Sequence, residues 1–309
     1  MEGQVYYPYL RGKQYELLAL RELIEKDIIT GNIVPIVEPI KISPILLNLL
    51  DIYTKAGKTI GIIQNSEYGT FYEDIGSIKN SEYKEKYFSL LAANSFCLPV
   101  YILNKNINMI IPVSLDMESI AVCTDEDVVS FIPSLAQKYN INKFLIPDER
   151  IFKREIHGSK ILMSDNFRKQ KRNADYANSS DNFFSDDHLY FDDEGYNGFS
   201  DFSIIGNEYT ESGFAPYAVA IHMVYFDSEK KLRIHHFVSD SNDDYDDPQG
   251  KFAEALKKLM ESSLIEKSTY AYQEFKKFYE NRIYSGLGVI KKLSLMHHIE
   301  LISGYLQGR

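Results

Sequence analysis

Short apolar runs alternate with helix-patterned stretches along the first half of the chain. Each run is rich in β-branched residues, which is typical of strands covered on both faces of a parallel sheet. Seven such runs occur, at residues 5–10, 32–40, 58–64, 97–103, 119–124, 143–147 and 160–164. Strands that recur with helices between them predict βαβ units with right-handed crossovers.

The stretches between these runs carry helix signals of their own. Residues 14–28 repeat apolar residues with the period of a helix. Ser43 with Pro44 matches an N-cap followed by a first-turn proline, and Gly57 is a typical residue at a helix C-terminus. Further helices are expected over residues 82–94 and 125–139.

This alternation predicts an α/β protein of the TIM-barrel-like (β/α) class, complete or distorted, rather than a five-stranded open sheet. No glycine-rich phosphate loop follows the first predicted strand, which weakens the case for a dinucleotide-binding sheet. We expect the barrel-like core to span residues 1–210, with seven or eight mainly parallel strands.

The pattern changes after about residue 176. Residues 178–202 are acidic, aromatic and punctuated by glycine, which predicts an ordered insertion rather than a free linker. Residues 217–226 and 231–239 follow as two strands of an antiparallel hairpin. A helix over residues 251–260 and two later helices complete a second part, residues 211–309, which we expect to pack on the same core.

The last of these helices, over residues 286–306, is predicted to be amphipathic, because it is apolar but carries lysines, histidines and a glutamate. Its apolar face should be buried, either within the fold or against a partner protein or a second copy of the chain. The residues expected to be buried are Leu287, Ile290, Leu293, Leu295 and Met296.

Composition narrows the classes of partner. The 309 residues are 44% hydrophobic and 25% charged, ordinary values for a globular protein. A net charge of -10 argues against broad nucleic-acid binding but leaves room for a local basic patch.

Cys97 and Cys123 lie in apolar runs without zinc spacing, as buried thiols do in a reducing compartment. With no signal peptide and no run of membrane-spanning length, we expect a cytoplasmic protein that does not contact a membrane.

Candidate chemistry gathers where the predicted strands end, because functional sites of parallel β/α folds form at that rim. Three carboxylates are the catalytic candidates: Glu38, Asp148 and Asp165. Six further side chains are candidate ligand-binding residues: Arg11, Lys13, Lys41, Arg168, Lys171 and Asp201. The alternative for each is a solvent-facing group or a helix cap.

Glu38 is the most suggestive of these residues. It lies between apolar residues in PIVEPI, so its carboxylate should be buried and in need of a partner. Arg11 or Lys13, at the end of the neighbouring strand, would supply that partner. Such a pair could anchor a phosphate or carboxylate, or could be a structural ion pair.

Two other stretches hold three further ligand-binding candidates. Arg168 and Lys171 follow the seventh predicted strand directly, where barrels often bind phosphate. A phosphorylated ligand or a nucleic-acid end would dock there; a solvated helix face is the alternative. Asp201 lies in the tight apolar frame FSDFSIIG, either in a site or as the cap of a turn.

Signals for cofactors are weak. His222, one of His235 and His236, and Asp240 would form a two-histidine, one-carboxylate metal set, with structural cross-strand histidines as the alternative. The acidic run at 239–250 fails the EF-hand template, since Tyr245 replaces its glycine and Lys251 its bidentate glutamate. No cofactor is indicated with certainty, and a divalent ion such as Mg²⁺ at the rim carboxylates stays an open expectation.

Three blocks carry a resemblance to a known family: YYPYLRGKQYELLALREL, PIVEPIK, and the segment from FSDFSIIG through AVAIH and HFVSDSNDD to GKFAEAL. From residue 5 to about residue 260 the chain resembles the beta-protein-like family of uncharacterised prokaryotic and phage proteins. The resemblance implies a barrel-like outline and an occurrence near mobile elements and defence genes. It assigns no catalytic residues.

Two functions remain. The first is a hydrolase acting on a phosphorylated or nucleic-acid substrate in phage defence, with basic rim residues on the phosphate and carboxylates as metal ligands or general base. The second is a non-catalytic binding or scaffold component of a multi-protein defence complex, which the lack of a strong catalytic motif and the apolar last helix favour. A deep rim pocket with converging charges would favour the enzyme, and a filled mouth would favour the scaffold.

Overall fold

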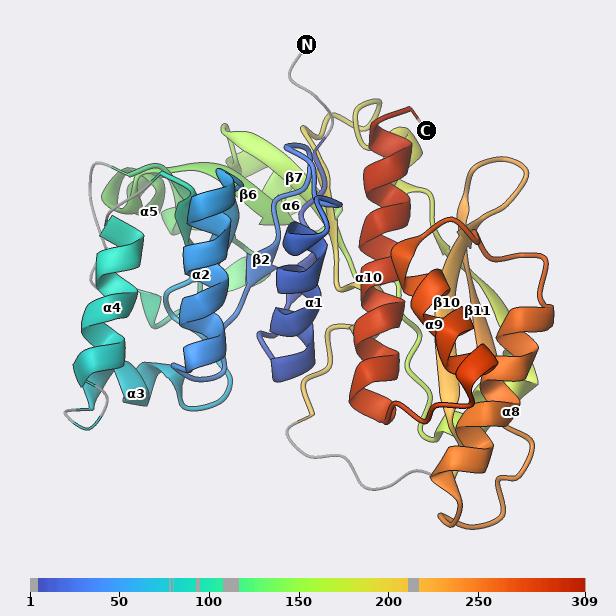
Figure 1. The fold of residues 1–309 in the computed structure, drawn as a ribbon. Helices are drawn as coiled ribbons and strands as arrows, with labels where there is room; N and C mark the ends of the chain where they lie inside the picture. The colour runs from blue at the N-terminus through green and yellow to red at the C-terminus, as the bar shows by residue number, and fades with distance from the viewer. Residues whose placement is uncertain are drawn as a thin grey trace. The chain divides into compact units, whose positions relative to one another are not determined.

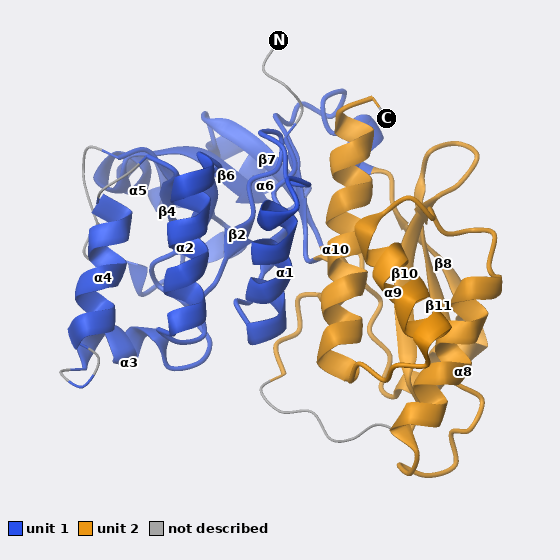
Figure 2. Cartoon of the chain, in the orientation of Figure 1, with its two compact units in different colours: residues 1–164, 187–202 blue, residues 165–186, 203–309 orange. Residues whose placement is uncertain are grey.

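The computed structural model describes residues 5–77, 79, 81–92, 95–107, 117–210 and 217–308. The chain forms two compact units (Figure 2). Unit 1 consists of residues 1–164 and 187–202, and unit 2 of residues 165–186 and 203–309. The predicted single boundary at residue 210 differs from this division, in which residues 165–186 and 203–210 group with the later part of the chain.

Unit 1 is a TIM-barrel-like α/β fold, as predicted. Its parallel sheet has the order β1-β2-β3-β4-β5-β6-β7-β9. The strands are β1 (Tyr9–Leu10), β2 (Ile36–Val37), β3 (Ile60–Ile63), β4 (Cys97–Ile102), β5 (Ser119–Val122), β6 (Ile141–Ile146), β7 (Ser159–Ser164) and β9 (Phe199–Asp201). A parallel bridge between Tyr6 and Phe199 brings the last strand beside the start of the first, so the sheet is nearly closed. Each of the seven predicted runs overlaps one of these strands, and β9 is the eighth.

Each helix predicted for unit 1 overlaps a helix of the structure, which adds short helices that were not predicted (Figure 1). They are α1 (Gln14–Glu25), α2 (Pro44–Ala56), α3 (Phe71–Gly76), α4 (Ser81–Ala92), η3 (Glu126–Phe131), α5 (Ile132–Tyr139), α6 (Arg150–Glu155) and α7 (Asp187–Tyr190). The Oγ of Ser43 accepts a hydrogen bond from the backbone N–H of Leu46 at 3.3 Å, and Gly57 ends α2 with φ of 63°. Both predicted ends of α2 are confirmed.

The helix predicted over residues 125–139 is divided. Asp125 does cap its start, because its Oδ1 accepts from the N–H of Asp127 at 3.0 Å. The first part is nevertheless the 3₁₀ helix η3, and the α-helix begins only at Ile132. Pro133 has no N–H to donate to the preceding turn, so a continuous α-helical ladder is interrupted there.

Unit 2 combines an antiparallel sheet with α-helices and short 3₁₀ helices (Figure 1). The sheet order is β10-β11-β8. The elements of unit 2 are η4 (Asn173–Ser179), β8 (Asp181–Ser185), η5 (Ser203–Ile205), β10 (Ala220–Phe226), β11 (Leu232–Val238), α8 (Pro248–Glu261), α9 (Tyr270–Asn281) and α10 (Leu287–Leu306). The predicted hairpin is confirmed as β10 and β11, in which His222 pairs with His236. The third strand, β8, was not predicted; it forms within the expected ordered insertion.

Helix α10 departs from the prediction of an amphipathic helix. Its buried residues run without a break from Leu293 to Ile299, which is more than a full turn, so no face of this stretch is exposed. The helix packs against β10, α9 and η5. Four of the five residues expected to be buried are so, whereas Leu287 is 39% exposed. Because the chain itself covers these apolar side chains, they give no evidence of a partner.

No helix in the described ranges combines the length and apolar character needed to span a membrane.

Replacing Leu293 with Asp should destabilise the protein strongly. Leu293 is 1% exposed, and an unpaired carboxylate at that position would lower the free energy of unfolding by about 3 kcal/mol or more. Thermal and chemical denaturation would measure this loss. Leu287→Asp is the matched control, since it places a carboxylate in the exposed first turn of the same helix, where the helix dipole favours it. Equal stability of the two variants would show that α10 is not part of the core.

Candidate functional site

The candidate site at the barrel mouth is a group of side chains around Glu38, here called the Glu38 cluster: Tyr9, Arg11, Glu38 and Glu67. The strands β1 and β2 are adjacent and parallel, so the residues that follow them lie side by side. Glu38 Oε2 accepts a hydrogen bond from the Tyr9 hydroxyl at 2.7 Å and forms an ion pair with Arg11 Nη1. Glu38 Oε1 accepts from the backbone N–H of Glu67 at 2.9 Å. Both oxygens of a carboxylate with 0% exposure are therefore occupied.

Arg11 is enclosed by aromatic rings. Its guanidinium carbon lies 5.2 Å from the ring centroid of Tyr9, 4.7 Å from that of Tyr68 and 5.4 Å from that of Phe202. Burial alone would lower the pKa of Arg11, but the neighbouring Tyr9 and Glu38 raise it above its usual value. The guanidinium therefore keeps its charge although only 6% of the residue is exposed.

A glycine makes this approach of the two strand ends possible. Gly12 has φ of 64°, a conformation that residues with a side chain rarely adopt. A Cβ at this position would lie 2.8 Å from the backbone oxygen of Glu38, too close for a side chain. Gly12 thus lets the chain turn directly over Glu38 at the residue that follows Arg11.

Three other polar side chains at the mouth of unit 1, Asp201, Asn65 and Gln64, are also hydrogen-bonded. The Tyr6 hydroxyl donates to Asp201 Oδ1 at 2.7 Å, and Asp201 is 3% exposed. Burial, reinforced by the charge of Asp201, raises the pKa of Tyr6 well above its usual value. The side chain of Asn65 imitates a strand, donating to the carbonyl of Ile102 at 2.7 Å and accepting from its N–H at 2.9 Å. The Nε2 of Gln64 donates to the carbonyl of Ile62 at 2.6 Å.

Of the nine predicted site residues, the structure joins Arg11 with Glu38 directly. Asp148 binds Lys153 on α6 and accepts from the Tyr196 hydroxyl at 2.8 Å; these hydrogen bonds lower the pKa of Asp148. The Asp148 carboxylate is thus bound to a side chain of the adjacent helix α6. Lys13 is half-buried at the N-cap of α1, and Lys41 is exposed before α2. The remaining predicted residues lie in unit 2 and are exposed: Asp165, Arg168 and Lys171.

Sequence reasoning missed a second polar group in unit 2, here called the Asp181 cluster: Asp181, Tyr225, Arg233 and His235. Asp181 accepts from the Tyr225 hydroxyl and from Arg233 Nε, each at 2.7 Å, and lies 3.2 Å from His235 Nδ1. Burial alone would raise the pKa of Asp181, but these hydrogen bonds hold it below its usual value. The cluster could not be found because it depends on β8, whose pairing with β11 was not predicted.

The hairpin histidines do not form the metal set considered from the sequence. His222 Nδ1 and His236 Nδ1 are 2.7 Å apart, so one imidazole donates to the other. His235 belongs to the Asp181 cluster instead, and Asp240 binds Lys258 at 2.6 Å. Among the residues that the structure describes, no three His, Cys, Asp or Glu side chains gather as metal ligands. A divalent ion therefore finds no ready-made ligand set in that part of the chain.

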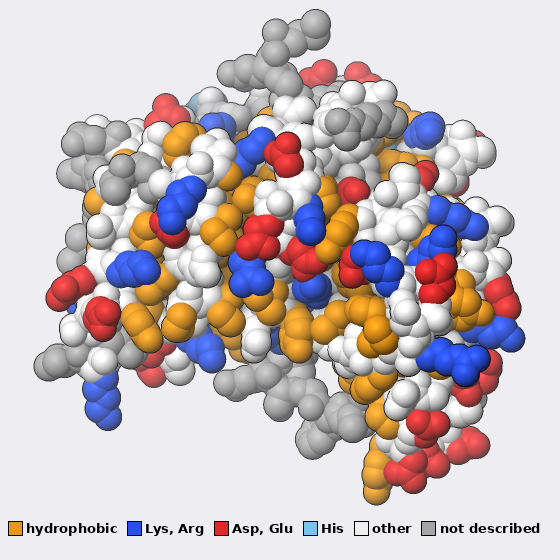
Figure 3. All heavy atoms as spheres, viewed as in Figure 1, with side chains coloured by type: hydrophobic (Ala, Val, Ile, Leu, Met, Phe, Trp, Pro, Cys, Tyr) orange, Lys and Arg blue, Asp and Glu red, His pale blue; other side chains and the backbone are white. Residues whose placement is uncertain are grey.

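Acidic side chains gather on the surface where α8 begins (Figure 3). They belong to the exposed loop that holds Asp243, Asp244, Asp246 and Asp247. Lys251, which stands where an EF-hand requires glutamate, is 3% exposed and donates to the carbonyl of Asp244 at 2.7 Å. A lysine of the chain therefore supplies a cation to this loop.

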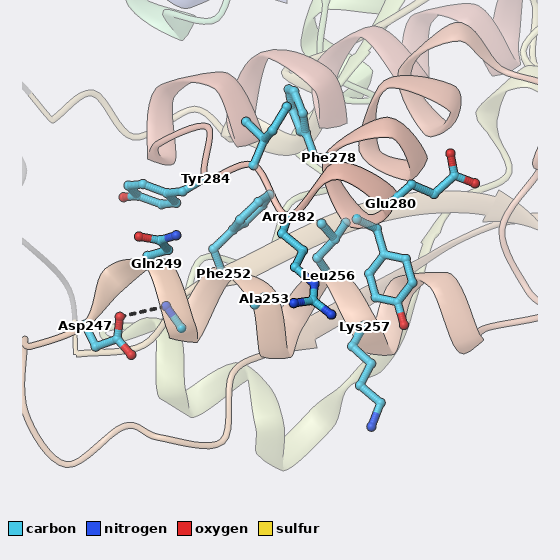
Figure 4. A pocket seen from close by; sticks show the side chains of 13 residues that line it. Asp247, Gln249, Phe252, Ala253, Leu256, Lys257, Phe278, Glu280, Arg282 and Tyr284 are labelled. Atoms are coloured by element: carbon cyan, nitrogen blue, oxygen red, sulfur yellow. Dashed lines mark hydrogen bonds between the residues drawn. The ribbon is translucent and has the colours of Figure 1, made fainter.

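A cavity of about 720 Å³ opens between α8 and the end of α9 (Figure 4). Its lining residues are Asp247, Gln249, Gly250, Phe252, Ala253, Leu256, Lys257, Phe278, Tyr279, Glu280, Arg282, Ile283 and Tyr284. A second cavity of about 460 Å³ is lined in part by His235, His236 and Lys258. Neither was predicted, because each is lined by residues from several elements, whose contacts no local motif encodes.

No protein-family model matches the chain, and searches of curated proteins and of solved structures likewise find no significant match.

Proposed function

We propose that this chain is a non-catalytic binding protein, with unit 1 as a rigid support and unit 2 as the ligand-binding part. The observation that carries the proposal is the closed state of the Glu38 cluster. Neither oxygen of Glu38 is free to take a proton from a substrate, because Tyr9, Arg11 and the N–H of Glu67 occupy them. The resemblance to the beta-protein-like family extends the proposal to a component of a multi-protein defence complex.

The neighbouring polar groups support the same function. Asp201 is bound by Tyr6, and Asn65 and Gln64 bond to strand backbone, so these three polar residues of the rim are held within the fold. A hydrolytic site instead needs groups that remain available to substrate and water. The mouth thus contains residue types found in active sites, but these residues make the hydrogen bonds of a structural core.

One observation favours a hydrolase as the second candidate function. His235, held 3.2 Å from the Asp181 carboxylate, lines the cavity of about 460 Å³. A histidine oriented by a carboxylate is a common general base, and Lys258, which pairs with Asp240, lines the same cavity and would place a positive charge beside a phosphate. A phosphorylated or nucleic-acid substrate would bind there rather than at the Glu38 cluster.

We expect the wild-type protein to show no turnover of p-nitrophenyl phosphate, or of end-labelled single-stranded DNA or RNA, with Mg²⁺ or Mn²⁺ present. Glu38→Gln and His235→Gln would be assayed beside it, with circular dichroism to confirm folding. Turnover that disappears in folded His235→Gln would replace the binding proposal with the hydrolase. Turnover that disappears in Glu38→Gln without a change in melting temperature would indicate that catalysis takes place at the barrel mouth.

A further inference from the structure

We propose that the cavity between α8 and α9 binds a small amphipathic molecule with a ring-sized apolar body and one anionic group, carboxylate or phosphate. This inference rests on the proposed binding function and names the ligand class. A volume of about 720 Å³ lies within the range of sites that take drug-sized ligands.

The floor and walls of the cavity are aromatic and aliphatic. Phe252 and Leu256, one turn apart on α8, form the floor and are each 2% exposed. The rings of Phe278 and Tyr284 lie 6.4 Å and 5.8 Å from that of Phe252, between ring centroids. Tyr279 and Ile283 remain 43% and 49% exposed at the edge, so apolar surface is available to a ligand.

The charges of the lining leave one cation unused. Asp247 accepts from the N–H of Gly250 at 2.9 Å, as the cap of α8. Lys257 lies 3.7 Å from Glu261 in a loose surface ion pair, and Glu280 lies 3.7 Å from Lys276 in another. Within the described part of the chain, the guanidinium of Arg282 has no hydrogen bond or ion pair. Because Arg282 is exposed, its guanidinium is available to an anionic group of a ligand.

The backbone at Arg282 gives a second, independent indication. Arg282 ends α9 in the left-handed conformation, with φ of 54°. Glycine is the usual residue at that position because a side chain there costs conformational energy. Figure 4 shows the Arg282 side chain extending from the end of α9 toward α8. A strained position that keeps a long cationic side chain over a cavity points to use of that side chain in binding.

The guanidinium would bind the anionic group of the proposed ligand, and the apolar floor would bind its ring-sized body. The planar donors of arginine match the two oxygens of a carboxylate or phosphate. Lys257, on the α8 side of the lining, adds a second positive charge to the cavity. The apolar body would then lie against Phe252 and Leu256 and cover the exposed Tyr279 and Ile283, so a molecule with both parts should bind more tightly than either part alone.

Two fluorescent probes test this inference on the full-length protein. 8-Anilinonaphthalene-1-sulfonate carries an anion, and N-phenyl-1-naphthylamine has the same rings without it. We expect Arg282→Gly to weaken binding of the anionic probe by about tenfold, the loss of one charge-assisted contact. The neutral probe should bind as before, and the melting temperature should stay equal or rise because glycine suits this backbone. Ala253→Trp, which fills the cavity mouth, should weaken both probes.

The control is Arg154→Gln, an exposed arginine on α6 that should leave both affinities unchanged. Displacement of the anionic probe by phenylacetate or by phenyl phosphate would support the inference and show which anion is preferred; displacement by neither would overturn it. It would also be overturned if Arg282→Gly weakened both probes equally, or if Ala253→Trp weakened neither. These outcomes are separate from the turnover assay, which alone tests the absence of catalysis.

Discussion

Replacing Arg11 with Met should lower the free energy of unfolding by about 3–5 kcal/mol, because it leaves the Glu38 carboxylate buried without its cation. Tyr9 and the N–H of Glu67 would still donate to Glu38, but neither carries a compensating charge. Denaturant unfolding followed by circular dichroism would measure the loss. This is the largest effect that we expect from any single substitution in unit 1.

A double-mutant cycle separates the ion pair from the packing around it. Glu38→Gln alone should also destabilise, since the amide nitrogen of Gln cannot accept a hydrogen bond. The variant that combines Arg11→Met with Glu38→Gln should recover part of the loss, because no unpaired charge then remains buried. Lys55→Met, which removes an exposed pair with Asp51, is the control and should change stability by less than about 1 kcal/mol. Strictly additive losses would argue against a direct Arg11–Glu38 interaction.

Acidification from pH 7 to pH 5 should destabilise the protein through its buried histidines. Burial lowers the pKa of His236 and of His297 to about 4, from an ordinary value of 6.5. Between these values the unfolded chain binds protons that the folded chain does not, so stability is full above pH 6.5 and falls until about pH 4. Each of these two histidines should lower the free energy of unfolding by about 2 kcal/mol at pH 5. Burial raises the pKa of Glu300, so this residue acts in the opposite direction and reduces the total loss of stability.

The contacts of His297 fix the tautomer of its neutral ring. Val224 offers only a carbonyl, so His297 Nε2 must donate to it, at 2.8 Å. His297 Nδ1 then accepts from the Thr269 hydroxyl at 2.8 Å, which links α10 to the N-cap of α9. Unfolding curves at pH 7, 6 and 5 would test the prediction. His297→Gln should flatten the pH dependence, the exposed His157→Gln should not, and equal stability at pH 7 and 5 would refute it.

The sequence was sufficient for the barrel and for its central ion pair. The β-branched runs identify strands because both faces of a parallel sheet are apolar, and a single helix between the first two runs makes their ends neighbours. That adjacency and the apolar context of Glu38 predict a cationic partner, Arg11 or Lys13, and in the structure Arg11 pairs with Glu38. What the pattern could not show is that Tyr9 and Glu67 also bind Glu38, because both contacts depend on side-chain direction and loop path.

The features of unit 2 were harder to predict for a physical reason. The residues of β8 are polar and aromatic without clear alternation, and they become a strand only by pairing with β11. The Asp181 cluster therefore has no local signature. The cavity depends on where α9 ends, and Arg282 gives no sequence signal for a left-handed residue, since glycine would be the usual choice.

The path of the chain between β7 and β9 has a consequence for synthesis on the ribosome. After β7 the chain contributes η4 and β8 to unit 2, and then returns to unit 1 for α7 and β9. The barrel cannot be completed before β9 is made, and β8 then has no strand to pair with until β11 has emerged. For that interval a nascent chain would expose an unpaired strand edge, the kind of surface that chaperones recognise and that invites aggregation. Expression with slowed translation or reduced chaperone supply should therefore affect the yield of this protein more than that of a barrel with an uninterrupted order of strands.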